Sequence, residues 1–277
     1  IQGPSISYNN MSFFKEDDID KTLLLYDGGG IGDKIMYSRF IPILCNKYEK
    51  NNVIFLVDDC LEWMFNDCFK DYSNYRTVPY SKKKIVRFDY HCNILSLIKY
   101  LNLGINDIPF TPLLKDISYK CNKDKVTNGN KTYIFNWKGN PMNGHEKGNR
   151  RMELKNAIPL FSIPGVNWIV ITKDITKEEK NILKKYNIDF RGYIVDNGKN
   201  CYEDSIGILK VVNGVFSTDT SLAHLSANMG VPTYVMLTIG CDWRWATDLW
   251  YPNSVLLKQQ KYGCWESVIS DIIKIIC

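Results

Sequence analysis

The chain has 277 residues, of which 45% are hydrophobic and 23% charged, a composition typical of a globular protein with room for two domains. The net charge of +5 comes without a dense run of lysine and arginine, which argues against nucleic-acid binding and is compatible with an anionic small ligand. No stretch is apolar enough to span a membrane, and nine scattered cysteines without a CxxC pair argue against a disulfide framework or a zinc site. We therefore expect a cytoplasmic protein.

The N-terminal half begins with a polar arm at residues 1–20 and an expected strand at 22–26. A glycine-rich turn follows, in which Gly30 and Gly32 let the backbone approach a ligand closely. Asp33 then stands at the start of an amphipathic helix. The same pattern fits a tight turn in which Asp33 only caps the helix, and local sequence does not separate the two interpretations.

Further strands are expected at 53–57 and 84–88, with a helix at 61–69 between them. His91 follows the second of these strands, and open α/β sheets bind ligands outside the carboxyl ends of their strands. A structural hydrogen-bonding histidine is the alternative. A polar run near residues 115–130 predicts the boundary between an N-terminal domain at 21–120 and a C-terminal domain at 121–277.

The C-terminal domain opens with an expected strand at 133–137 and a basic, glycine-rich loop. A basic loop after a strand can clamp a diphosphate, although a solvated surface loop has the same composition. The basic residues here are Lys138, Lys147, Arg150, Arg151 and Lys155. Next come an expected strand at 168–172, a helix at 176–186 that Thr176 and Glu179 would cap as a capping box, a short strand at 192–195 and a helix at 201–209.

Residues 211–237 form the most regular unit, with a strand at 211–216, a helix at 220–229 and a strand at 233–237. Such a unit directs backbone N–H groups and the positive end of a helix dipole toward Asp219, Thr220 and Ser221, which favours phosphate binding. The Thr220 and Ser221 hydroxyls can add hydrogen-bond donors, and His224 lies one turn further on the same side. Many capped strand–helix turns of this kind bind nothing.

The segment 242–252 is rich in tryptophan and contains Arg244, which could stack on a nucleobase or stiffen a hydrophobic lid. A terminal helix is expected at 265–276. All three histidines, His91, His145 and His224, fall just after predicted strands or in the helix behind one. In two facing α/β domains these positions converge on one cleft.

The sequence resembles the GT-B glycosyltransferases, specifically the heptosyltransferase-like family and its relatives fused to tetratricopeptide repeats. The resemblance covers about residues 21–277 and is carried by five runs: GIGD at 30–33, DYHC at 89–92, WKGNP at 137–141, STDTSLAHL at 217–225 and DWRW at 242–245.

This resemblance implies an α/β, GT-B-like fold with two Rossmann-like domains facing across a cleft. It implies a nucleoside-diphosphate-sugar donor held mainly by the C-terminal domain, and neither a metal nor another cofactor. Asp33 matches the residue thought to act as general base, with Gly30 and Gly32 close to the donor.

The donor-phosphate loop of the family matches Asp219, Thr220 and Ser221, followed by His224. Lys138 or Arg151 falls in the region that binds the donor diphosphate. Arg244 falls in the half of the protein that binds the donor, and His91 falls on the acceptor side.

The predicted function is that of a metal-independent, inverting glycosyltransferase that moves a sugar to a hydroxyl of a glycan, lipid-linked or protein acceptor. Two alternatives stay open. One is a nucleotide-sugar epimerase or hydrolase of the same fold, and the other is an inactive sugar-nucleotide-binding or scaffolding module. The net charge of +5 is too small to argue for a nucleic-acid partner.

Overall fold

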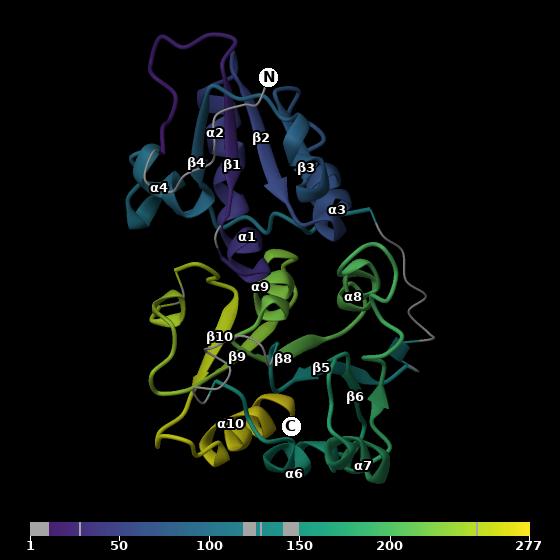
Figure 1. Ribbon diagram of the computed structural model, residues 1–277. Coiled ribbons are helices and arrows are strands. Elements are labelled where there is room, and N and C mark those ends of the chain that lie inside the picture. The colour runs from purple at the N-terminus through teal and green to yellow at the C-terminus, as the bar shows by residue number, and fades with distance from the viewer. Residues whose placement is uncertain (1–10, 28, 119–125, 128, 141–149, 248) are drawn as a thin grey trace. The chain divides into compact units, whose positions relative to one another are not determined.

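A computed structural model describes residues 11–27, 29–118, 126–127, 129–140, 150–247 and 249–277 (Figure 1). The chain divides into two compact units. The first comprises Ile1–Ser118 together with Gly198–Cys201, and the second comprises Tyr119–Asn197 and Tyr202–Cys277.

The first unit contains a parallel sheet whose described strands lie in the order β3-β2-β1-β4. Its strands are β1 (Thr22–Tyr26), β2 (Asn52–Val57), β3 (Tyr75–Pro79) and β4 (Tyr90–Asn93), and its helices are α1 (Ile31–Tyr37), α2 (Ile41–Lys47), α3 (Glu62–Cys68) and α4 (Leu97–Tyr100). The strands are rich in buried aliphatic side chains because helices pack against a parallel sheet on both faces.

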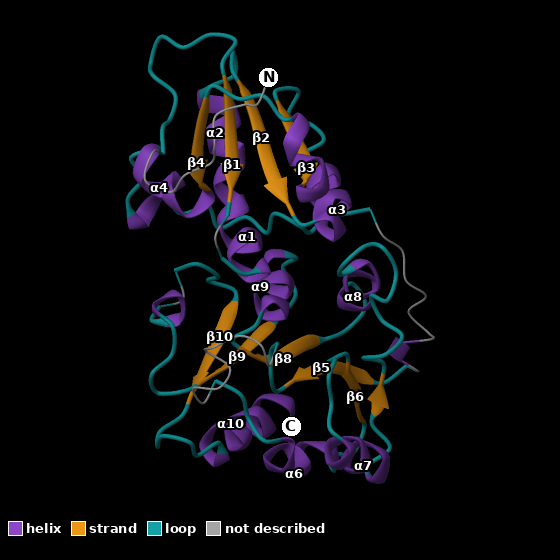
Figure 2. Ribbon diagram, viewed as in Figure 1, coloured by secondary structure: helices purple, strands orange, loops and turns teal. Residues whose placement is uncertain are grey.

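The second unit contains a larger parallel sheet, with its described strands in the order β10-β9-β8-β5-β6-β7. Its strands are β5 (Lys131–Asn136), β6 (Val166–Val170), β7 (Asp189–Phe190), β8 (Gly214–Thr218), β9 (Thr233–Leu237) and β10 (Ser254–Lys258), and its helices are α6 (Ile158–Phe161), α7 (Lys177–Lys185), α8 (Glu203–Leu209), α9 (Ser221–Asn228) and α10 (Glu266–Ile276). Within this unit, α8 and α9 lie on one side of the sheet, and α6, α7 and α10 lie on the other (Figure 2).

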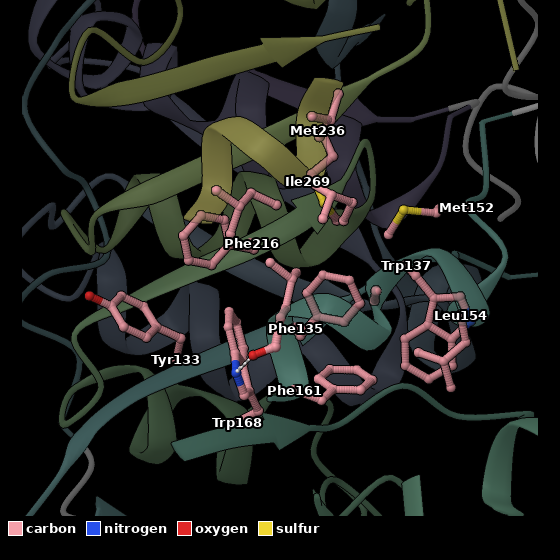
Figure 3. Packing of buried hydrophobic residues seen from close by; sticks show 14 of the residues in the cluster. Tyr133, Phe135, Trp137, Met152, Leu154, Phe161, Trp168, Phe216, Met236 and Ile269 are labelled. Carbon is pink, nitrogen blue, oxygen red and sulfur yellow. Dashed lines mark hydrogen bonds between the residues drawn. The ribbon is translucent and has the colours of Figure 1, made fainter. Parts of the chain in front are cut away.

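An aromatic core fills the space between the second sheet and α10 (Figure 3). Phe135 and Phe216 come from the neighbouring strands β5 and β8, and both are fully buried. Trp168 in β6 packs against both rings and donates its indole N–H to the Leu160 carbonyl at 2.9 Å. Because successive side chains along a strand point to opposite faces, the residues next to these aromatics in each strand face α8 and α9 instead.

The central strand–helix–strand unit predicted for residues 211–237 is present as β8, α9 and β9. Gly230 has a φ of +76°, as expected for the glycine that ends a helix, and Pro232 follows it. The strand begins at Gly214 rather than 211 because the Val211 N–H is bonded to the Ile208 carbonyl in the turn after α8.

Two other expected strands are wrong. Residues 84–88 do not form a strand, because Lys84 lies exposed in a 3-10 helix, Tyr80–Ile85, and the Val86 N–H donates to the Lys83 carbonyl at the end of that helix. Residues 192–195 form a turn that follows β7 directly, because the N–H groups of Ile194 and Val195 both reach the Arg191 carbonyl.

The cysteine pattern argued against a disulfide framework, and the structure contains one disulfide among the described residues. Cys60 and Cys201 are disulfide-bonded across a sequence separation of 141 residues, and both belong to the first unit. The Cys201 N–H also donates to the Cys60 carbonyl at 2.9 Å. The pairing depends on tertiary structure, so no local spacing of cysteines could indicate it.

Candidate functional site

The strand order of the second sheet reverses between β5 and β8. From β5 the chain proceeds outward through β6 and β7, and from β8 it proceeds in the opposite direction through β9 and β10. Ligands of doubly wound sheets bind outside the carboxyl ends of the strands at such a reversal. Asn136 and Ser217 are register partners at the carboxyl ends of β5 and β8. We call residues 217–221 the switch-point loop.

Helix α9 begins directly behind this loop, with Thr220 as its N-cap residue. Within the described part of the chain, the Thr220 side chain makes no capping hydrogen bond to the helix. The backbone N–H groups of the first helical turn are therefore not occupied by this side chain, and the helix dipole adds partial positive charge at the same end. This arrangement suits an anion such as phosphate.

Buried hydrogen bonds instead hold the Thr220 hydroxyl beneath the loop. The Asn136 amide nitrogen donates to Ser217 Oγ and to Thr220 Oγ1, each at 3.1 Å. The amide oxygen of Asn136 accepts from Thr172 Oγ1 at 2.6 Å, at the end of β6. All four side chains are buried, so the network fixes three strand ends and the loop against one another.

Arg150 and His224 lie beside Asp219, a partly buried residue at the turn of the switch-point loop. Its carboxylate lies 3.6 Å from Arg150 Nε and 3.9 Å from His224 Nε2. His224 is buried, stacks on Trp245 with ring centroids 4.9 Å apart, and shares a 2.9 Å hydrogen bond between its Nδ1 and the Tyr251 hydroxyl. A guanidinium and an imidazole thus lie next to the Asp219 carboxylate at the loop.

Arg244 lies in a 3-10 helix, Trp243–Trp245, next to an exposed indole. Its guanidinium pairs with Asp242 at 2.8 Å and lies 5.1 Å from the centre of the Trp243 ring, which is 58% exposed. Burial alone would raise the pKa of Asp242, but hydrogen bonds from Arg244 and the nearby charge of Arg150 outweigh it and lower that pKa. The exposed indole, with the guanidinium beside it, is suited to stack on a planar group.

The predicted diphosphate clamp residues occupy different places. Lys138 binds the Glu179 carboxylate at 2.7 Å and the Asp174 carbonyl at 3.0 Å, at the start of α7, where Glu179 completes the predicted capping box with Thr176. Arg151 is exposed, and its neighbour Arg150 is the residue that meets the switch-point loop. Residues 141–149, which include His145, lie outside the described residues.

In the first unit, Asp33 lies at the start of α1, just beyond β1. The strand order reverses between β1 and β4, so this turn also follows a strand at a reversal. The Gly30 N–H donates to Asp33 Oδ2 at 2.9 Å, which completes a helix-capping arrangement. A methyl group at Gly29 would lie 2.3 Å from the same oxygen, so the glycine leaves room for the carboxylate.

A buried ammonium anchors this turn from behind. Lys34 Nζ lies 2.5 Å from Asp27 and 2.9 Å from Asp58, and the Tyr80 hydroxyl donates to Asp27 at 2.9 Å. Burial raises the pKa of Asp27, although Lys34 and Tyr80 act to lower it. The ion cluster therefore ties β1 and α1 to the ends of β2 and β3.

His91 does not lie beyond a strand end as predicted. It is a residue of β4, with its ring 5.8 Å from that of Tyr26 and 5.7 Å from that of Phe88. Burial lowers the pKa of His91, which favours its neutral form. The sequence placed it incorrectly because the strand before it was assigned to residues 84–88.

The sequence also left several site residues unidentified: Asn136, Thr172, Tyr202, Tyr251 and the contact made by Arg150. Asn136 carried a usable signal, because it is a polar residue near the carboxyl end of a strand next to a predicted binding loop.

Among the described residues, no group of three or more histidine, cysteine, aspartate and glutamate side chains is arranged to hold a metal ion. None of their helices is long and apolar enough to cross a membrane.

The sequence matches no protein-family model and no curated protein. The structure is similar to that of a glycosyl transferase family 9 protein from Veillonella parvula, at 12% identity and a TM-score of 0.58, covering 92% of this chain and 96% of the other. It is also similar to E. coli ADP-heptose LPS heptosyltransferase II, at 10% identity and a TM-score of 0.59, covering 92% and 98%.

A third similar structure is E. coli heptosyltransferase WaaC with ADP-2-deoxy-2-fluoro heptose, at 10% identity and a TM-score of 0.57, covering 92% of this chain and 100% of the other. At such low identity the likeness concerns the fold. The chain has the α/β fold with parallel sheets of these glycosyltransferases, which agrees with the fold that the sequence motifs implied.

Proposed function

We propose that this protein is a glycosyltransferase that moves a sugar from a nucleoside-diphosphate sugar to an acceptor hydroxyl, with inversion and without a metal ion. The observation that carries the proposal is the switch-point loop. In this loop, helix α9 begins with an N-terminus that the Thr220 side chain does not cap. This N-terminus lies at a topological reversal of the sheet, and Arg150 contacts the same loop. The shared fold of nucleotide-sugar transferases supports the same function.

In this proposal the donor diphosphate binds at the switch-point loop, against the N–H groups at the start of α9. Arg150, which lies beside Asp219, is the cation best placed to pair with the phosphates, and Lys138 and Arg151 are the other candidates. The exposed Trp243 indole, with Arg244 beside it, is suited to the nucleobase. His224 lies 3.9 Å from the other carboxylate oxygen of Asp219.

Asp33 is the proposed general base. The acceptor oxygen forms a bond to the anomeric carbon while its proton passes to the Asp33 carboxylate. The bond from the anomeric carbon to the phosphate oxygen breaks, and the nucleoside diphosphate leaves with the electron pair. The helix N-terminus and Arg150 stabilise the charge that develops on the leaving group. One direct displacement inverts the anomeric configuration.

The test is an activity assay with a panel of nucleoside-diphosphate sugars, with EDTA present and with glycan, lipid-linked and protein acceptors added or omitted. The proposal predicts sugar transfer that depends on the acceptor and survives EDTA, with an inverted product by NMR. Turnover that needs no acceptor would instead identify an epimerase or hydrolase. Donor binding without any turnover would identify an inactive binding or scaffolding module.

A matched pair of variants tests the phosphate contact. Arg150→Ala should weaken nucleoside-diphosphate binding about tenfold, as expected for the loss of one hydrogen bond to a charged group. Arg151→Ala, which removes the neighbouring exposed guanidinium, should change the dissociation constant less. The reverse order would assign the contact to Arg151.

A further inference from the structure

The hydrogen-bond donors available at the switch-point loop can be counted proton by proton. Ser217 Oγ donates its one proton to the Thr218 carbonyl at 2.8 Å. It lies 3.0 Å from Thr220 Oγ1, so the proton in that contact must come from Thr220. Thr220 also accepts from Asn136. The Thr220 hydroxyl therefore has no proton left for a ligand.

Ser221 has the opposite arrangement. The Tyr202 hydroxyl donates to Ser221 Oγ at 2.6 Å. Burial raises the pKa of Tyr202 to about 12, so the phenol keeps the proton that it donates. A serine that accepts one hydrogen bond still has its own proton to donate. Ser221 is the last residue of the switch-point loop and the first of α9, so this proton is carried at the N-terminal end of the helix.

Tyr202 is held in an unusual backbone conformation to make this contact. Its φ is +62°, in the left-handed region that residues with a Cβ rarely adopt. The loop around it is closed by a reciprocal pair of bonds, from the Asp196 N–H to the Asp204 carboxylate and from the Asp204 N–H to the Asp196 carboxylate, each 2.8 Å long. These bonds close the loop that carries Tyr202, from which the phenol reaches Ser221.

We propose that Ser221, and not Thr220, supplies the hydroxyl hydrogen bond to the donor phosphate, and that Tyr202 is the positioning residue that directs it. Asn136 is also a positioning residue. It holds the Thr220 hydroxyl inside the protein, so this hydroxyl does not cap the start of α9. The inference rests on the proposed function and adds to it the residue that contacts the phosphate and the residue that orients it.

The test is a double-mutant cycle on nucleoside-diphosphate binding, with Ser221→Ala, Tyr202→Phe and the double variant. Dissociation constants are measured by calorimetry with the diphosphate of adenosine, guanosine, uridine or cytidine that binds the wild type most tightly. Ser221→Ala should raise the dissociation constant about tenfold, and Tyr202→Phe should raise it by a smaller factor. In the Ser221→Ala background, Tyr202→Phe should have no further effect, because the phenol acts through the serine.

Tyr75→Phe is the matched control. Tyr75 also forms a 2.9 Å hydrogen bond to a hydroxyl, that of Thr77, but in the first unit. Melting temperatures of all variants without ligand separate a loss of stability from a loss of contact. Tyr75→Phe should lower the melting temperature as Tyr202→Phe does and leave diphosphate affinity unchanged.

The outcomes separate this inference from the proposed function. A wild type that binds a diphosphate, together with unchanged affinity in Ser221→Ala, would overturn the inference alone. An effect of Tyr202→Phe that is fully additive with Ser221→Ala would overturn the positioning role. Failure of the wild type to bind any of the four diphosphates would overturn the proposed function and the inference together.

Discussion

Asp33 and Asp107 make the same local contact in two different places. Each accepts a hydrogen bond from the backbone N–H of the glycine three residues earlier, at 2.9 Å from Gly30 and at 2.7 Å from Gly104. Asp33 follows β1 at the reversal of the first sheet, whereas Asp107 ends a short 3-10 helix beyond α4. If capping were the whole role of Asp33, the two residues would tolerate the same substitution equally.

Asp33→Asn should therefore reduce sugar transfer by about 10²- to 10⁴-fold, the usual contribution of a general base. The asparagine oxygen still accepts from Gly30, so donor affinity and melting temperature should stay close to the wild type. Asp107→Asn is the control and should retain full turnover. Steady-state rates for both variants provide the measurement, and unimpaired transfer by Asp33→Asn would eliminate Asp33 as the base.

Gly29→Ala tests whether the position of the carboxylate matters. The new methyl group would lie 2.3 Å from Asp33 Oδ2, so the side chain must move away. Transfer should fall strongly while the melting temperature falls only slightly, because the moved group is a flexible side chain and the lost cap is worth about 1 kcal/mol. Gly104→Ala, whose methyl group meets Asp107 at an ordinary 3.4 Å, should keep its activity. Equal activity of the two variants would contradict the assignment.

At the scale of elements, Lys34 joins helix α1 to the strands beside it. It is buried between Asp27 and Asp58, and Asp27 is also buried. Removing one member of a buried ion pair leaves an uncompensated charge, which is more costly than the pair is stabilising. The stability of the glycine-rich turn therefore depends on this one ammonium.

Lys34→Met should lower the free energy of unfolding by about 3–5 kcal/mol, because Asp27 would remain buried without its counter-ion. Lys50→Met, at an exposed position, should change it by less than about 0.5 kcal/mol. Urea unfolding of both variants at pH 7 gives the comparison. Similar values for the two would mean that the cluster contributes little to stability.

Elements with a strong local pattern were predictable from the sequence. The β-branched run before the switch-point loop, Gly230 and Pro232 together predicted β8, α9 and β9, and Thr176 with Glu179 predicted the cap of α7. Strand β4 was missed because it is only four residues long, and the more apolar stretch just before it imitated a strand.

The candidate loop was predictable, but its supporting contacts were not. The three partners of Asn136 lie 36, 81 and 84 residues away in sequence, and they come together only when β5, β6 and β8 pair. The sequence could thus suggest that Thr220 donates to phosphate, whereas we infer from the hydrogen bonds that its proton is used internally. Periodicity and motif spacing do not encode such long-range contacts.

At the scale of the whole molecule, one covalent bond joins distant parts of the sequence. The segment Gly198–Cys201 belongs to the first unit although the chain on both sides of it belongs to the second. The Cys60–Cys201 disulfide holds this segment, and the Trp63 indole N–H donates to the Cys201 carbonyl at 3.1 Å. Tyr202, the residue proposed to orient Ser221, follows directly.

Alkylation in denaturant without reductant should therefore leave Cys60 and Cys201 unlabelled in protein purified under air, and a reductant should expose both. Cys45 and Cys92 are the controls, because they are free thiols that burial protects only in the folded state. Peptide mass spectrometry locates the labels. Labelling of Cys60 and Cys201 without reductant would show that this bond is not formed and would agree with the reducing compartment that cysteine usage suggests.

The central claim is that the second unit binds a nucleoside diphosphate at the switch-point loop. The most direct measurement is a thermal-shift titration of the wild-type chain with the four nucleoside diphosphates and their sugars, with and without EDTA. A ligand that binds only the folded state raises the melting temperature by mass action. We predict a concentration-dependent rise with one diphosphate that EDTA does not change. Folded protein with no shift for any of these ligands would contradict the claim.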